Sequence, residues 1–208
     1  MNSGLLGFGL GFVGSMPIGG PVSLFVFKRG ASGRYRDGIL LAAGAAVAEA
    51  GYCGAALFGY GLLAERWPMF RPVLGVVGAV IMIALGAHFL ATRHFAPGDL
   101  PVPPAPTSAL RDLTLGFSMV ALNPSVFVSW LAVLAALHAV GLEPTDGGDR
   151  LFLVGGVAVG IVTWFTLLVW LLHHGRTWIR PVVFDRTLRA FGGGLCVLGL
   201  YVLYSRLF

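Results

Sequence analysis

The sequence predicts an all-α polytopic membrane protein with six transmembrane helices. Of its 208 residues, 57% are hydrophobic and only 11% are charged, whereas a soluble domain carries about 25% charged residues. The apolar residues are gathered in segments that approach or exceed the roughly 20 residues a membrane-spanning helix needs. The net charge of +5 is therefore no sign of nucleic-acid binding, because excess Lys and Arg in a membrane protein report its orientation.

Six apolar segments follow one another along the chain. They cover residues 5–27, 38–63, 72–92, 113–139, 151–172 and 190–204. The stretch between the third and fourth segments is rich in proline, which prevents a continuous helix there. We therefore predict a first three-helix repeat at residues 1–96, a cytoplasmic linker at 97–110 and a second three-helix repeat at 111–208.

Basic residues are distributed unequally between the loops. The loops after the first, third and fifth segments hold ten of the fourteen basic residues: Lys28, Arg29, Arg34, Arg36, Arg93, Arg111, Arg176, Arg180, Arg186 and Arg189. The positive-inside rule assigns these odd-numbered loops to the cytoplasm. Both termini are then expected outside, and the two halves have opposite orientation.

The two halves also resemble one another in sequence. The third segment ends in GAHFLATR (residues 86–93) and the sixth in GLYVLYSR (residues 199–206). Likewise, GFVGSMPIGGPVSLFVF in the first segment resembles GFSMVALNPSVFVSW in the fourth, and each holds a proline near its middle. These matches predict two inverted repeats whose first helices are broken at proline, a recurring plan of secondary transporters.

The break in the first segment combines two prolines with two glycines, Pro17, Gly19, Gly20 and Pro21. A proline disfavours the carbonyl four residues earlier, so the carbonyls of Val13 and Pro17 are expected to lose their helical hydrogen bonds. Pro21 suits the first turn of a second half-helix, whose first N–H groups, near Ser23, can bind an anion. We interpret this break as a binding site, with a packing kink as the alternative.

Glu49 is the only acidic residue deep within a predicted segment. A charged group near the midplane costs at least ~2.5 kcal/mol and is a functional candidate by default. We therefore predict that Glu49 binds a proton or a substrate ammonium, the alternative being a protonated glutamate held for packing. Since no basic residue lies deep in a predicted segment, a buried ion pair is not expected.

Asn123 and Pro124 mark the break in the fourth segment. Pro124 is expected to release the carbonyl of Val120, and Asn123 to cap or line the gap. Ser125 either faces the same cavity or makes an ordinary interhelical hydrogen bond. The segments hold no cluster of His, Cys and carboxylate side chains typical of a metal site, so no metal and no cofactor is predicted.

These motifs together resemble the lysine exporter (LysE/RhtB) family of bacterial inner-membrane exporters. The matching residues are PIGGP at 17–21, KRGASGRYRDG at 28–38, GAAVAEAGY around Glu49 and the Asn-Pro pair at 123–124. The chain departs from the family in its extra glycine, where Pro-Ile-Gly-Pro is usual, and in Glu49, where many members have Asp. The resemblance implies a protein that is not an enzyme and exports amino acids or related metabolites across the bacterial inner membrane.

The residues and the resemblance together predict a proton-coupled antiporter that works by alternating access. Its expected partners are a small-molecule substrate, protons and the lipid bilayer, while homo-oligomerisation is left open. Three alternatives stay open as well: a divalent-metal exporter, a non-transporting membrane partner in lipid export, and a redox component that uses Cys53 and Cys196.

Overall fold

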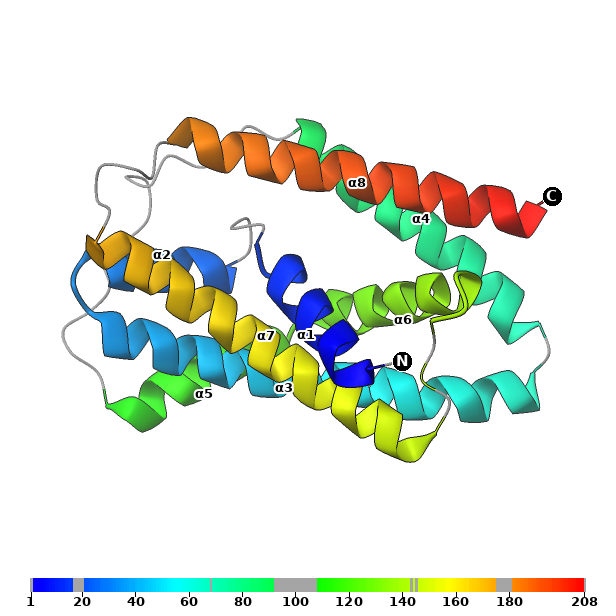
Figure 1. The fold of residues 1–208 in the computed structure, drawn as a ribbon, viewed down its shortest axis with the longest axis horizontal. Helices are drawn as coiled ribbons and strands as arrows, with labels where there is room; N and C mark the ends of the chain where they lie inside the picture. The colour runs from blue at the N-terminus through cyan, green and yellow to red at the C-terminus, as the bar shows by residue number, and fades with distance from the viewer. Residues whose placement is uncertain are drawn as a thin grey trace.

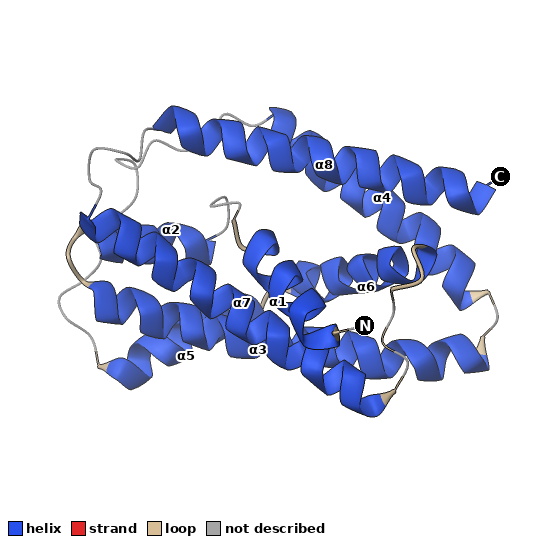
Figure 2. Cartoon of the chain, in the orientation of Figure 1, coloured by secondary structure: helices blue, strands red, loops and turns tan. Residues whose placement is uncertain are grey.

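The computed structural model describes residues 2–16, 21–67, 69–91, 108–142, 144, 146–174 and 181–207. Every regular element within these ranges is a helix, as Figure 2 shows. In chain order the helices are α1 (Ser3–Gly14), α2 (Pro21–Ala31), α3 (Tyr35–Arg66), α4 (Phe70–Ala91), α5 (Ala109–Ala121), α6 (Pro124–Ala139), α7 (Gly147–His174) and α8 (Pro181–Leu207). The all-α class predicted from composition is confirmed.

The longest apolar helices are α3 and α7. Residues Tyr35–Gly59 of α3 and Gly147–His174 of α7 are long and apolar enough to cross a membrane. The α5–α6 pair makes a third span if it is counted as one, with a bend of 64° between the two helices. Within the described residues the structure therefore has two or three candidate spans and is a helical membrane protein.

Two helices begin at proline. Pro21 is the first residue of α2 and Pro124 the first residue of α6, a position where the ring has a helical φ and the missing N–H is not needed. The helices that precede them, α1 and α5, end at Gly14 and Ala121. The predicted site residues Pro17, Gly19 and Gly20 lie outside the described residues.

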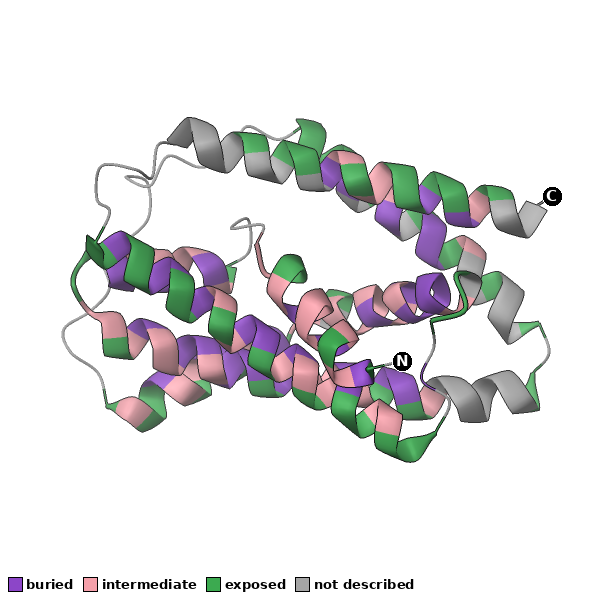
Figure 3. Cartoon of the chain, in the orientation of Figure 1, coloured by how far each residue is buried: buried purple, intermediate pink, exposed green. Residues whose placement is uncertain are grey.

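The long helices α3 and α7 contact α1, α2, α5 and α6, whereas α8 packs mainly on α4. In Figure 1, α4 and α8 lie side by side along one edge of the molecule, while α3, α5 and α7 lie toward the opposite edge. The first helix, α1, packs on α7, α5 packs on α3, and α6 contacts both α3 and α4. Buried residues line the faces that these helices turn toward one another (Figure 3).

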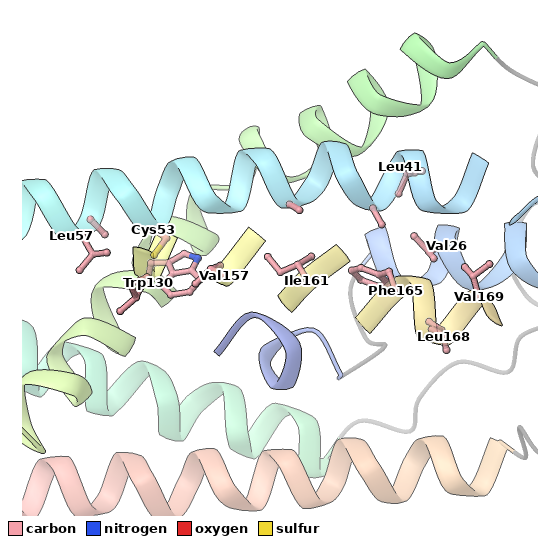
Figure 4. Packing of buried hydrophobic residues seen from close by; sticks show 14 of the residues in the cluster. Val26, Leu41, Cys53, Leu57, Trp130, Val157, Ile161, Phe165, Leu168 and Val169 are labelled. Atoms are coloured by element: carbon pink, nitrogen blue, oxygen red, sulfur yellow. The ribbon is translucent and has the colours of Figure 1, made fainter. Parts of the chain in front are cut away.

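The main core lies between α3 and α7 (Figure 4). Leu41 of α3, Val26 of α2 and Val157 of α7 are fully buried there, and Trp130 of α6 closes the same cluster. Large apolar side chains such as Val47, which is 62% exposed, remain on the outer faces. In a membrane protein such residues face lipid.

Glycines let α3 and α5 approach until their backbones touch. A Cβ on Gly116 of α5 would overlap the carbonyl oxygen of Leu41, and a Cβ on Gly44 of α3 would overlap that of Leu113. Only glycine therefore fits at these two positions without separating the helices, which is the role small residues play at membrane helix interfaces.

The contact between α1 and α7 repeats this geometry. A Cβ on Gly11 would overlap the carbonyl oxygen of Val157, and a Cβ on Gly160 would overlap that of Phe8. In all four helices the contacted carbonyl belongs to the residue three positions before the contacting glycine. The two helix pairs therefore cross in the same register.

The α4–α8 pair is reciprocal as well. A Cβ on Gly86 of α4 would meet the carbonyl oxygen of Gly192, and a Cβ on Gly199 of α8 would meet that of Ala79. In both helices the contacted residue lies seven positions before the glycine. Gly86 and Gly199 are the glycines that begin the two matching segment ends found in the sequence.

Candidate functional site

The ends of three helices meet along one face of α3. Ala45 and Ala48 of α3 are buried together with Val120 of α5, and we call these three residues the junction cluster. Side chains that pack against it come from both sides of the α5–α6 break and from the start of α2: Ala121, Val126 and Val22, together with Tyr52 of α3. The beginnings of α2 and α6 and the end of α5 therefore lie against the same stretch of α3.

Glu49 lies on this stretch of α3. It directly follows Ala48, and residues three or four positions apart on a helix are neighbours, so Ala45 and Tyr52 lie one turn to either side of it. Its side chain is half-buried. Among the described residues, the Glu49 carboxylate has no hydrogen-bond or ion-pair partner.

At the α5–α6 break, a carbonyl other than the predicted one is bonded by a side chain of α3. The Val120 carbonyl was expected to be released, but it accepts a hydrogen bond of 2.9 Å from the N–H of Asn123. That prediction was wrong because the last turn tightens to an i→i+3 bond, as helix ends commonly do. The Ala121 carbonyl instead accepts a hydrogen bond of 2.6 Å from the Tyr52 hydroxyl.

The end of α1 shows the same correction. The carbonyl of Val13 was expected to be free, yet it accepts a hydrogen bond of 3.1 Å from the N–H of Met16. Here too the last turn is tightened, so that the N–H three residues later donates in place of the N–H four residues later that a regular helix would use. The carbonyl of Pro17, the other group expected to be released, lies outside the described residues.

The other predicted site residues lie at the starts of α2 and α6. Pro21 is exposed, and Ser23 is buried. Asn123 caps α6 by accepting a hydrogen bond of 3.1 Å from the N–H of Ser125, and the Ser125 hydroxyl donates to the same amide oxygen at 2.7 Å. Asn123, Pro124 and Ser125 therefore form one local capping structure, and what joins it to α3 is the packing of Ala121 and Val126.

A buried ion pair was missed in the sequence. Arg29 of α2 and Asp112 of α5 form a salt bridge of 2.6 Å, with side chains only 2% and 1% exposed. Arg29 also donates to the carbonyl of Asp37 at 2.9 Å. The expectation of no buried ion pair was wrong because both residues lie at segment ends. A charged residue there is expected to belong to an exposed loop.

The position of Asp112 carried a usable signal. It lies four residues before Gly116, so it shares the face of α5 that packs on α3. At the same end of the molecule the Tyr35 hydroxyl forms a hydrogen bond with Nδ1 of His173, joining α3 to α7. Polar contacts therefore link α2, α3, α5 and α7 at the end that the charge distribution assigns to the cytoplasm.

Together these features define a helical membrane protein in which helix ends meet beside a carboxylate within a long apolar helix, an arrangement typical of secondary transporters. A family model described as LysE type translocator matches residues 12–206. The chain therefore belongs to the LysE type translocator family, as the motifs predicted. Comparison with curated proteins and with solved structures gave no match.

Proposed function

We propose that this protein exports amino acids or related small metabolites across the bacterial inner membrane in exchange for protons. Membership of a translocator family supports small-molecule transport. The observation that carries the proposal is the position of Glu49, a half-buried carboxyl group in α3 beside the cluster where α2, α5 and α6 meet. A carboxyl group in such a place can exchange a proton or bind an ammonium group, and competition between the two couples their movements.

The substrate carboxylate binds at the start of α2 in this proposal. The first N–H groups of a helix carry partial positive charge and bind anions. Those of Ser23 and Leu24 belong to the first turn of α2, and Val22 between Pro21 and Ser23 packs against the junction cluster. An amino acid that spans the distance from this turn to Glu49 would thus be bound at both of its charged groups.

The proposed topology is six spans in two inverted repeats, at residues 1–96 and 111–208 with a cytoplasmic linker at 97–110. In this topology α1 with α2, and α5 with α6, each form one span broken at proline. The shared glycine register of the α1–α7 and α3–α5 crossings supports it, as does the reciprocal α4–α8 contact. Odd-numbered loops lie in the cytoplasm and both termini lie outside, which suits alternating access around a site between the repeats.

Transport by purified protein in liposomes tests the proposal. Proteoliposomes are loaded with members of a labelled amino-acid panel, and efflux is measured with and without an inward proton gradient. We expect the gradient to accelerate efflux of at least one substrate from the wild type. Glu49→Gln should abolish this acceleration because it cannot release a proton, whereas Glu49→Asp should keep part of it.

A matched control makes the same chemical change elsewhere on α3. Glu65, close to the end of this helix at Arg66, is replaced by Gln and should leave gradient-driven efflux as in the wild type. Unchanged gradient dependence in Glu49→Gln would remove Glu49 from the coupling mechanism. Absence of efflux for every member of the panel from wild-type protein would contradict amino-acid export itself.

A further inference from the structure

Tyr52 is the one described side chain of α3 seen to hydrogen-bond to the end of α5. Its hydroxyl donates to the carbonyl of Ala121, the last residue of α5, and its ring lies 5.9 Å from that of Phe127 in α6. A single side chain therefore contacts both helices that meet at the break. It also lies three residues after Glu49, a spacing that brings two side chains of a helix together.

The chemistry of a phenol makes these two neighbours competitors. A tyrosine hydroxyl has one proton and so donates one hydrogen bond at a time. A hydrogen bond to an ionised carboxylate is roughly twice as strong as one to a neutral carbonyl. When Glu49 is protonated the hydroxyl is left to the Ala121 carbonyl, and when Glu49 is ionised the carboxylate is the better acceptor.

We infer that Tyr52 is a positioning residue. Its hydroxyl donates a hydrogen bond to the Ala121 carbonyl in one state and to the Glu49 carboxylate in the other. The inference rests on the proposed function and deepens it. Ionisation of Glu49 frees the Ala121 carbonyl to accept from a substrate ammonium beside the carboxylate. When Glu49 is protonated, Tyr52 again donates to the Ala121 carbonyl. The substrate ammonium then loses both acceptors at once, which strengthens the coupling between proton binding and substrate release.

Few other ionisable groups surround this pair. Cys53 is buried one turn along α3, and Arg29 of α2 pairs with Asp112 of α5. The ionisable side chains of α6 and α7 all lie within the first or last turn of their helix: His138, Asp149, Arg150, His173 and His174. Glu49 is thus the group whose ionisation can change the acceptor of the Tyr52 hydrogen bond.

The test compares two transport assays on Tyr52→Phe, which removes only the hydroxyl. Counterflow measures substrate exchange without a proton gradient, and gradient-driven efflux measures coupled export. We expect counterflow within about twofold of wild type and gradient-driven efflux reduced about tenfold, the loss that one hydrogen bond to a charged group predicts. Tyr201→Phe, the same change at an exposed position of α8, should leave both rates as in the wild type.

Two results would overturn the inference. Equal losses in both assays would show that Tyr52 only supports the fold, and wild-type rates in both would show that the hydroxyl is not used. A wild type without gradient-driven efflux would instead contradict the proposed function.

An infrared measurement on the protein itself tests the inference separately, and it does not require a stable Tyr52 variant. Spectra of the wild type are recorded as the pH is raised. They should show a shift of a tyrosine C–OH band that is absent from Glu49→Gln. The same band shift in Glu49→Gln would contradict a switch governed by Glu49.

Discussion

The crossings of α3 with α5 and of α1 with α7 share a scaffold and differ in chemistry. Both have glycines at equivalent positions whose missing side chains let the backbones touch. Yet Glu49 lies five residues after Gly44, while the residue five positions after Gly160 is Phe165. Tyr52 is matched in the same way by Leu168. At these two positions the α3–α5 crossing is polar and the α1–α7 crossing is apolar.

The acidic residue of the buried ion pair also has no charged counterpart at the α1–α7 crossing. Asp112 lies four residues before Gly116, whereas the residue four positions before Gly11 is Gly7, which packs against Leu153. A crossing of this geometry thus forms without a charged side chain at this position. Because charged groups are costly within a membrane, Glu49 beside the α3–α5 crossing is the group to which the proposed function assigns a role.

The largest expected effect comes from breaking the charge pair that marks one crossing. Asp112→Asn leaves the Arg29 charge buried without its counterion and should lower the free energy of unfolding by about 3–5 kcal/mol. Unfolding in mixed micelles titrated with SDS measures this change. Asp37→Asn serves as control, because the Arg34–Asp37 pair is part-exposed and worth at most about 1 kcal/mol. Equal losses in both variants would contradict a special role for burial.

The next effect tests whether the two crossings are structurally equivalent. Gly116→Ala and Gly11→Ala each introduce a methyl group against a carbonyl oxygen of the facing helix, and each should cost about 1–3 kcal/mol, as overpacking does. The same SDS titration applies. Gly51→Ala, at a position with nothing within 4 Å, should be neutral or stabilising. A loss in only one of the two variants would show that the shared register does not reflect a shared scaffold.

The smallest effect concerns how the two crossing helices begin. Asn2 caps α1 by accepting from the N–H of Leu5 at 3.4 Å, and Ser108 caps α5 by accepting from the N–H of Arg111 at 3.3 Å. Replacing either residue with Ala should cost about 0.5–2 kcal/mol. Thermal unfolding of Asn2→Ala and Ser108→Ala, read from monodispersity in detergent, should show similar small shifts. An unchanged unfolding temperature in both variants would show that these caps do not stabilise the two helices.

Features that depend on local composition were predictable from the sequence. The low charge content and long apolar segments predict helices in a membrane because a bilayer leaves backbone groups no partner but their own helix. The order of short motifs around Pro21, Glu49 and Asn123 predicted the family. The capping of α6 by Asn123 is likewise local, since the amide reaches an N–H two residues away.

Features that depend on how helices meet were not predictable. Arg29 and Asp112 come from opposite halves of the chain and become a pair only once α2 and α5 are placed together. The rule that proline frees the carbonyl four residues earlier singled out Val120, but a tightened last turn bonds that carbonyl, and the side-chain hydrogen bond goes to the Ala121 carbonyl. Its donor, Tyr52, comes from the other half of the sequence.

The glycine crossings have a mechanical consequence. Where two backbones touch, no glycine side chain stands between them, so a rotation of one helix on the other would not have to separate the two backbones first. Gly44 and Gly116 lie well inside α3 and α5, and a small rotation there swings the helix ends through a larger arc. A rotation about either crossing would therefore move the helix ends while the helices themselves stay intact.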